Sequence, residues 1–393
     1  MRLTFFLFTD IRTGRGTENV ALNLVKYKPR DIELTIVYTD GFDKLRLSEE
    51  YVMKMTASCK KIKIHTHNIF NKSRPNFFKR IYRDFIKRPV YKDLKAIRGS
   101  TLLAKIQQTD IVYLFHNKYA IFFNNANIPI IGTDHTDSIS EIFKSSWIIK
   151  KLYSEFYFRN INGVHLFPKY NHLYNKFKLK YKMVLPNGVD CNLFFPRNSN
   201  IRKNVMEVKK EDSEINDRIK FLFVGGLVPQ KGLDIILPLI EKIDLKNAEF
   251  HIVGSGPMEE IIKSNKKIIY HGGIDNEKLS LIYRDCDVFL YPTRGDSFGL
   301  VILEALSSGL YVITSDYMRG TFDDFEGRYL EYIPLDIEII KTRIERIIKN
   351  KELISHDKME EYKYVKEHYD WEVIANNFYS HMREFYNENL ISK

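Results

Sequence analysis

Two carboxylates at a fixed spacing mark the stretch of the chain that is best suited to chemistry. Asp296 lies in a polar loop, 292–297, and Glu304 lies in a predicted helix, 298–308. At about 1.5 Å of rise per residue, Glu304 is expected about one and a half turns into this helix, with Asp296 just before its start. The residues around Glu304 are apolar, and a carboxylate in such surroundings costs free energy unless it is paired or bound. The pair therefore indicates a ligand site, with helix capping as the alternative role for Asp296.

The neighbouring elements place this pair at the edge of a sheet. An apolar strand, 288–291, precedes the loop, and Gly309 ends the helix before a second strand, 311–314. The succession of strand, loop, helix and strand is typical of parallel sheets, whose carboxyl edges bind ligands.

Three glycine turns upstream of the pair also join strands to helices. The first contains Gly225, Gly226 and Lys231, the second Gly254 and Gly256, and the third Gly272 and Gly273. Glycine lets a phosphate approach the backbone, a helix N-terminus favours negative charge, and lysine adds a point charge. Each turn alone could be an ordinary connection, but together they favour a diphosphate site.

Strands and helices alternate along both halves of the chain. The predicted strands are 2–9, 33–38, 62–66, 111–115, 128–133, 163–167 and 182–185, followed by 220–224, 249–253, 267–271, 288–291 and 311–314. This alternation predicts parallel sheets with helices on both faces.

Two residues of the first half stand where such a sheet could bind a ligand. Gly16 lies in the turn before a helix predicted over 20–25, and His135 follows the strand 128–133. The turn lacks the GxGxxG pattern of a dinucleotide site. A structural role is the alternative for the lone histidine.

A polar, charged stretch over 196–218 separates the two halves and indicates a domain boundary. We predict an N-terminal domain over 1–195, a linker over 196–218, a C-terminal domain over 219–368 and a terminal helix over 369–393 that is capped by Asp370. With 393 residues, the chain is long enough for two cores.

The composition is that of a soluble protein, with 44% hydrophobic residues and no apolar run long enough to cross a bilayer. The opening residues, MRLTFFLFTD, are predicted as a core strand, because their apolar run is too short for a secretory signal. Three distant cysteines, Cys59, Cys191 and Cys286, indicate neither a disulfide framework nor a zinc site. A reducing cytoplasm is the expected location.

One segment accounts for the net charge of +11, because residues 60–105 contain fourteen Lys or Arg side chains against two aspartates. Within it, aromatic and basic residues alternate at helical spacing, among them Phe77, Phe78, Lys79, Arg80, Arg83, Lys87 and Arg88. Such a stretch can bind an anionic membrane, with about 1 kcal/mol from each basic residue. A core-packed helix with a solvated basic face is the alternative. Nucleic acid is not an expected partner, because no nucleic-acid motif accompanies the charge.

The motifs and their order resemble those of the retaining nucleotide-sugar glycosyltransferases of the GT-B fold, in the large family numbered four. The second half carries FVGGLVPQKGLD, GSGP, HGGI, RDCDVFLYPT and GDSFGLVILEALSSG, which contains the two acids of a Glu-x7-Glu signature; the first half carries RGTENVALNLV, GTDHTDS and PNGVD. The resemblance implies an α/β protein of two Rossmann-like, doubly wound domains facing a central cleft. The first domain would bind the acceptor, and the C-terminal helix would cross back to it.

The resemblance also implies roles for individual residues. Glu304 would hold the donor ribose, Asp296 would face the transferred sugar, and Lys231 would neutralise the leaving diphosphate. The catalytic set would be Asp296, Glu304, Lys231 and His135, and the donor-binding set would be Gly16, Gly225, Gly226, Lys231, Gly254, Gly256, Gly273, Ile274, Ser297, Phe298, Gly299, Leu300 and Glu304.

Two positions depart from the family pattern. Aspartate stands at 296 where glutamate is usual, and its side chain is shorter by about one carbon. Glycine stands at 226 where arginine is usual, which leaves Lys231, or a basic residue elsewhere, to balance the diphosphate.

The implied reaction displaces a nucleoside diphosphate from an anomeric carbon with retention of configuration. Negative charge develops on the departing phosphate, so cations and backbone N–H groups would stabilise the transition state. No Asp-x-Asp motif at a strand end indicates a metal site, so neither a metal nor another cofactor is expected.

The expected partners are a nucleotide-diphosphate sugar, a glycan or glycolipid acceptor of the cell envelope and the anionic inner face of the cell membrane. The nucleotide of the donor stays open among UDP, GDP and ADP. Two other functions also stay open, a nucleotide-sugar epimerase on the same fold and a non-catalytic basic binding protein.

Overall fold

The computed structural model describes residues 1–7, 9–13, 16–39, 47–64, 108–117, 120, 123, 128–133, 161–174, 181–197 and 218–391. The chain forms two compact units. The first comprises Met1–Leu166, Asn171–Leu185 and Ala375–Lys393, and the second comprises Phe167–Tyr170 and Pro186–Ile374. Some predicted site residues lie outside the described residues, namely His135 and the basic set Phe77, Phe78, Lys79, Arg80, Arg83, Lys87 and Arg88.

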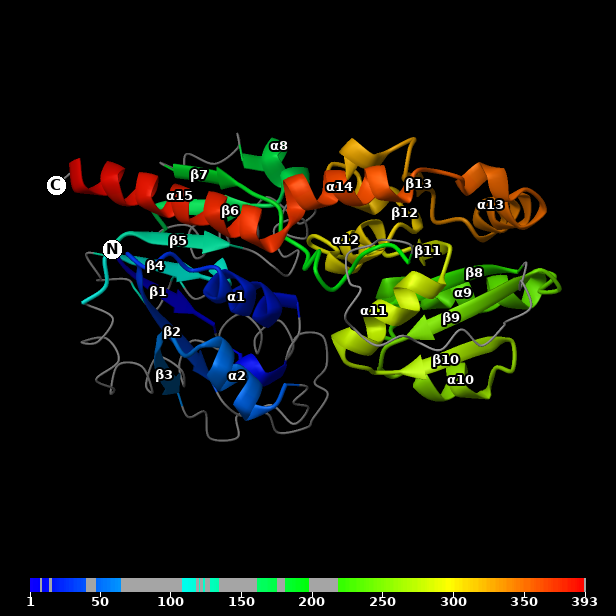
Figure 1. Cartoon of the computed structure of the whole chain (residues 1–393), viewed down its shortest axis with the longest axis horizontal. Coiled ribbons are helices and arrows are strands. Elements are labelled where there is room, and N and C mark those ends of the chain that lie inside the picture. Colours follow the sequence, from blue (N-terminus) through cyan, green and yellow to red (C-terminus); the bar gives the residue numbers. More distant parts are fainter. Residues whose placement is uncertain are drawn as a thin grey trace, which may run out of the picture. The chain divides into compact units, whose positions relative to one another are not determined.

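A seven-stranded sheet, in the order β3-β2-β1-β4-β5-β6-β7, forms the core of the first unit (Figure 1). Its strands are β1 (Arg2–Phe6), β2 (Glu33–Thr39), β3 (Lys60–Ile64), β4 (Ile111–Leu114), β5 (Ile130–Thr133), β6 (Gly163–Leu166) and β7 (Tyr181–Val184). All of these pairings are parallel. Side chains such as Phe5, Ile36 and Val112 are fully buried, as expected where helices cover a parallel sheet.

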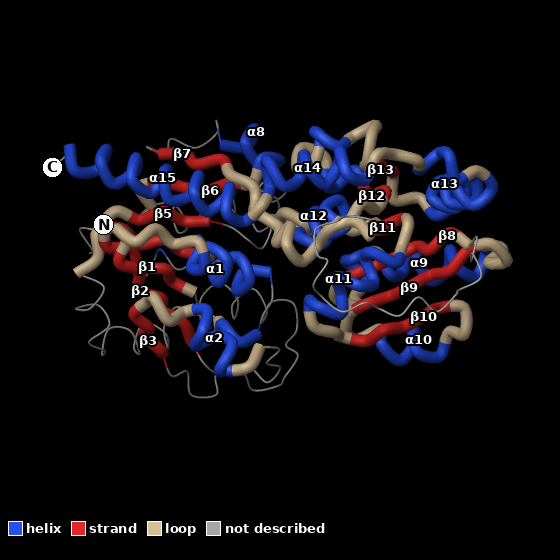
Figure 2. The backbone as a smooth tube through the Cα atoms, viewed as in Figure 1, coloured by secondary structure: helices blue, strands red, loops and turns tan. Residues whose placement is uncertain are grey.

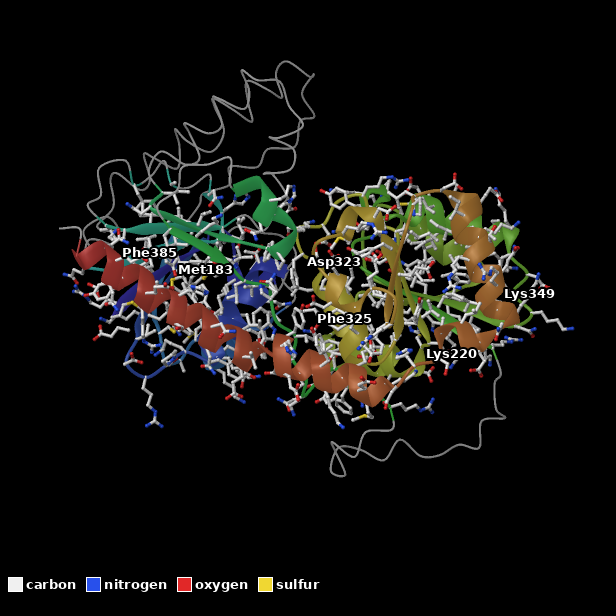
Figure 3. The ribbon with its side chains drawn as sticks, turned by 90° about the horizontal axis from the view of Figure 1, so that it is seen from above. Met183, Lys220, Asp323, Phe325, Lys349 and Phe385 are labelled. Atoms are coloured by element: carbon white, nitrogen blue, oxygen red, sulfur yellow. The ribbon has the colours of Figure 1, made fainter. Side chains whose placement is uncertain are left out.

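The helices of the first unit bury apolar side chains to different extents. They are α1 (Gly16–Lys26), α2 (Glu49–Met55), α8 (Asn171–Tyr174) and the larger part of α15 (Trp371–Ile391), and α1 and α15 bury the most. Phe378 of α15 lies 5.9 Å from the ring of Phe5, and the hydroxyl of Tyr379 donates a 2.7 Å hydrogen bond to the carbonyl of Leu24. Met183 and Phe385, labelled in Figure 3, are both buried in this core.

A six-stranded parallel sheet, in the order β10-β9-β8-β11-β12-β13, forms the core of the second unit. Its strands are β8 (Ile219–Val224), β9 (Ala248–Val253), β10 (Ile268–Gly272), β11 (Val288–Tyr291), β12 (Tyr311–Ser315) and β13 (Leu330–Ile333). Its helices are α9 (Leu233–Lys242), α10 (Glu259–Ser264), α11 (Asn276–Asp285), α12 (Leu300–Ser307), α13 (Ile337–Lys349) and α14 (Lys358–Tyr369). Figure 2 shows the alternation of strands in red with helices in blue.

The predicted strands all form, with small shifts at their ends. The strand at 288–291 matches β11, whereas the strand predicted at 62–66 begins earlier, because the register of β3 pairs Lys60 with Thr35. The helix predicted from 298 begins at Leu300 instead. Gly299 has a φ of 84°, a left-handed conformation that cannot belong to a right-handed helix.

The boundaries of the compact units differ from those of the predicted domains. Residues 186–195 belong to the second unit, because the hydroxyl of Ser307 donates to the carbonyl of Phe194 at 2.7 Å and that of Tyr362 donates to the carbonyl of Cys191 at 3.0 Å. Helix α15 begins in the second unit and continues into the first from Ala375. Asp370 caps it as predicted, accepting from the backbone N–H of Glu372 at 2.9 Å. None of the helices in the described part of the chain is long and apolar enough to cross a bilayer.

Candidate active site

Asp296 lies in the loop between β11 and α12, at the carboxyl edge of the second sheet. Its Oδ2 lies 2.6 Å from Nζ of Lys231 and accepts a 2.8 Å hydrogen bond from the hydroxyl of Tyr291. Its Oδ1 accepts from the backbone N–H groups of Phe298, at 3.3 Å, and Gly299, at 3.0 Å. Asp296 therefore ties down the start of the helix, which is the alternative role considered for it, and it also forms an ion pair with Lys231, which the sequence did not predict.

Burial would raise the pKa of the Asp296 carboxyl, but the opposing effects prevail. The charge of Lys231 and its hydrogen bond, the hydrogen bond from Tyr291 and the charge of Lys169 together hold this pKa below its ordinary value. The carboxylate is thus ionised at neutral pH, although its side chain is only 18% exposed.

Lys231 reaches Asp296 because their strands are neighbours. It ends η5 (Pro229–Lys231), which follows β8, and β8 pairs with β11. Its Nζ also donates to the carbonyl of Gly295 at 3.0 Å. The two loops touch closely, since a Cβ at Gly232 would lie 2.1 Å from the carbonyl oxygen of Pro292, and the φ of Gly232 is 91°. Glycine is therefore required here for Lys231 to meet Asp296.

Lys169 is a second cation at Asp296, and it was missed in the sequence. It lies in η4 (Pro168–Tyr170), directly after β6, and belongs to the second unit. Its Nζ donates to the main-chain oxygen of Asp296 and lies 4.8 Å from the ring centroids of both Tyr170 and Tyr317. No motif surrounds Lys169 in the sequence. Only its burial, with 7% exposure, sets it apart from other lysines.

Glu304 lies on the less buried side of α12, together with Leu300 and Val301. Its Oε2 accepts a 3.0 Å hydrogen bond from the hydroxyl of Tyr283, a buried residue of α11. Burial raises the pKa of Glu304 to about 7, and the hydrogen bond from Tyr283 opposes that rise. A carboxylate that is held by one donor and partly exposed can still accept hydrogen bonds from a ligand.

The glycine turns after β8 and β9 pack against each other. A Cβ at Gly254, whose φ is 143°, would lie 1.9 Å from the carbonyl oxygen of Gly225. A Cβ at Gly256 would lie 2.7 Å from the carbonyl oxygen of Leu227. Packing between the two turns therefore favours glycine at both positions. Gly226 differs, because no atom of the described residues lies within 4 Å of a Cβ placed there.

The remaining predicted residues of the second unit lie at or near the same edge. Ser297 and Leu300 flank the Asp296 cluster and are partly exposed, and Gly273 and Ile274 follow β10, with Gly273 exposed. Gly16 is the exposed first residue of α1 in the first unit. Among the described residues, no three His, Cys, Asp or Glu side chains are grouped so that they could hold a metal ion.

Comparison with known proteins identifies the relatives of the second unit and of the fold. Residues 205–366 match the family described as glycosyl transferases group 1. An uncharacterized 41.2 kDa protein in the cps region of Klebsiella pneumoniae is 35% identical over 39% of this chain and 42% of its own. A phosphatidylinositol N-acetylglucosaminyltransferase subunit of Saccharomyces cerevisiae is 28% identical over 34% of this chain and 30% of its own. The chain thus spans less than half the length of these two relatives.

The likeness to solved structures extends over nearly the whole chain. Anabaena HepE, solved in complex with UDP and glucose, superposes with a TM-score of 0.71 and 14% identity, covering 98% of this chain and 100% of its own. At this identity the likeness shows the fold, which is GT-B, with two Rossmann-like α/β units as expected.

Proposed function

We propose, from the glycosyl transferases group 1 match over residues 205–366 and the GT-B fold, that this chain transfers a sugar from a nucleotide-diphosphate sugar to an acceptor. One observation carries the proposal. At the carboxyl edge of the second sheet, Lys231 meets Asp296 directly before the helix that bears Glu304. A cation beside a helix N-terminus suits a diphosphate, and carboxylate oxygens can accept hydrogen bonds from the hydroxyls of a sugar or a ribose.

Lys231 would stabilise the leaving group. When the bond from the anomeric carbon to the diphosphate breaks, its electron pair remains on the phosphate oxygen. An ammonium group that the protein already holds in place stabilises that charge without reorganisation. Nζ of Lys231 lies 2.6 Å from the carboxylate of Asp296. In the complex, the same ammonium group would also contact the donor diphosphate.

Glu304 would accept hydrogen bonds from the ribose hydroxyls of the donor. Its partly exposed place on α12 and its single hydrogen bond from Tyr283 leave acceptor capacity for two hydroxyls. The backbone N–H groups of the first turn of α12 would add to the positive field near the phosphates, although those of Phe298 and Gly299 already bind Asp296.

We further propose retention of configuration, as in the glycosyltransferases of family four, and no metal. Lys231 and Lys169 at Asp296 would supply the positive charge that a metal gives other transferases. UDP is the first nucleotide to test, because HepE was solved in complex with UDP. His135 would contact the transferred sugar from the first unit.

A glycan or glycolipid acceptor at the inner face of the cell membrane is part of the proposal. It is supported by the basic aromatic segment that contains Arg80, Arg83 and Lys87, and by the yeast relative, whose name includes phosphatidylinositol.

The test measures sugar transfer from UDP-, GDP- and ADP-sugars to acceptors in a lipid extract. Glu304→Ala is expected to abolish transfer while leaving the circular dichroism spectrum unchanged, and Glu345→Ala, at the surface of α13, is the matched control. Turnover of the donor without any acceptor would indicate an epimerase instead. Nucleotide binding without turnover of any donor would indicate a non-catalytic binding protein.

A further inference from the structure

The fold builds a fixed place for the ammonium group of Lys169. Gly320, with a φ of 82°, lies so close that its Cβ would be 3.0 Å from Cα of Lys169. The rings of Tyr170 and Tyr317 each lie 4.8 Å from Nζ. A lysine side chain loses rotamer entropy when it is fixed, so packing of this kind must offset that loss.

Two ammonium groups meet one residue at this site. Nζ of Lys231 binds the carboxylate of Asp296, and Nζ of Lys169 binds its main-chain oxygen. Since Asp296 supplies one negative charge to the two cations, these three residues together carry one net positive charge. In surroundings of low dielectric constant this charge attracts an anion more strongly than it would in water.

The turn after β8 adds no positive charge at Gly226, so Lys231 is the cation that it supplies. Gly226 has no side chain, and within the part of the chain that the structure describes nothing lies within 4 Å of its Cβ position. Arg294, in the loop after β11, is engaged by Asp234 at 2.6 Å and by the carbonyl of Pro229 at 2.9 Å.

We propose that Lys169 binds the diphosphate of the donor together with Lys231 and so contributes to stabilising the leaving group. This inference rests on the proposed function. It assigns to the short segment after β6 a role in donor binding, although the other donor residues of the second unit come from its own sheet. The competing role for Lys169 is purely positional, holding the 292–299 loop by the carbonyl of Asp296.

The test compares nucleotides that differ by one phosphate. Binding of UDP, GDP and ADP, and of UMP, GMP and AMP, is measured by calorimetry for the wild type, Lys169→Met and the surface control Lys266→Met. Loss of a charged hydrogen bond is expected to weaken diphosphate binding by about tenfold or more in Lys169→Met, with monophosphate binding changed less than about threefold. Lys266→Met is expected to behave as the wild type.

A second substitution separates charge from position. Gly226→Arg, which places a cation in the open space, is expected to restore diphosphate binding in the Lys169→Met background. Equal loss of monophosphate and diphosphate binding without this rescue would show that Lys169 only positions the loop. Unchanged diphosphate binding in Lys169→Met would overturn the inference alone, whereas a wild type that binds none of the six nucleotides would overturn the proposed function as well.

Discussion

The carboxylate of Asp296 lies 2.6 Å from the ammonium group of Lys231, and the hydroxyl of Tyr291 donates to the same oxygen at 2.8 Å. Two residues that the sequence assigns to the donor are therefore also partners in the fold. Substitutions in this group are expected to change both stability and donor binding, so the two effects must be measured separately.

Asp296→Asn should destabilise the fold, because it removes the ion pair while an amide oxygen can still accept from the N–H groups of Phe298 and Gly299. Hydrogen bonds to charged groups contribute about 1.5–3 kcal/mol, and a loss of that order is expected in the free energy of unfolding by urea. The pKa of Asp296 lies below its ordinary value, so this contribution is present above about pH 4 and is lost as the pH falls. Equal stability of the variant and the wild type at pH 7 would contradict the prediction. Tyr291→Phe, which removes one donor only, is the matched control.

Donor binding should depend on pH near neutrality through Glu304. Its pKa is about 7, so the carboxylate gains a proton as the pH falls below that value and loses acceptor capacity for the ribose. Affinity for the nucleoside diphosphate should fall as the pH decreases from about 8 to about 6, and Glu304→Gln should remove this dependence.

Tyr283→Phe tests the cause of that pKa. The hydrogen bond from Tyr283 lowers the pKa of Glu304, so its removal should move the midpoint of the pH profile upward. A profile that stays in place in both variants would show that another group titrates.

The glycine turns should respond unequally to alanine. Gly254→Ala places a Cβ 1.9 Å from the carbonyl of Gly225 at a φ of 143°, so a loss of about 2 kcal/mol or more is expected from strain and displacement. Gly226→Ala meets open space and should change the unfolding free energy by less than about 0.5 kcal/mol. Similar losses in the two variants would argue against packing as the reason for Gly254.

A buried pair of a glutamate and a histidine should make the free energy of unfolding decrease as the pH rises. Glu361 is fully buried, and its Oε2 lies 2.8 Å from Nε2 of His356. Burial raises the pKa of Glu361 to about 8, although the hydrogen bond with His356 opposes that rise. Because the pKa is raised in the folded state, this contribution to stability is full below the ordinary pKa of a glutamate and is lost as the pH rises through about 8. Unfolding by urea between about pH 6 and pH 9 should show this decline, and Glu361→Gln should flatten it.

Membrane binding should depend on the basic aromatic segment of the sequence. Reversal of charge at Arg80, Arg83 and Lys87 should reduce sedimentation with vesicles that contain anionic lipid, because each basic residue contributes about 1 kcal/mol near such a surface. Reversal at Lys341, Arg346 and Lys349 of α13 is the control for net charge. Equal loss in the two variants would show that overall charge, rather than this segment, carries the binding.

Local patterns were sufficient for most of the elements and for the loops that meet in the candidate site. Alternating strands and helices predicted two parallel sheets, and the glycine turns predicted which loops meet at the edge of the second one. The prediction failed where backbone conformation decides, because it started α12 at 298, whereas the left-handed Gly299 delays the helix to Leu300. The predicted donor-binding role of Gly254 and Gly256 stays a prediction, and the structure adds that both glycines pack closely against the turn after β8.

The sequence by itself determined the spacing of Asp296 and Glu304, because this spacing depends only on the rise of one helix and on the loop before it. The tertiary structure alone decided which cations face Asp296. Lys231 arrives from the neighbouring strand β8, and Lys169 arrives from a segment 127 residues earlier in the chain. Contacts over such separations depend on the order of strands in the sheets and on the packing of their loops, and no local periodicity encodes either of these.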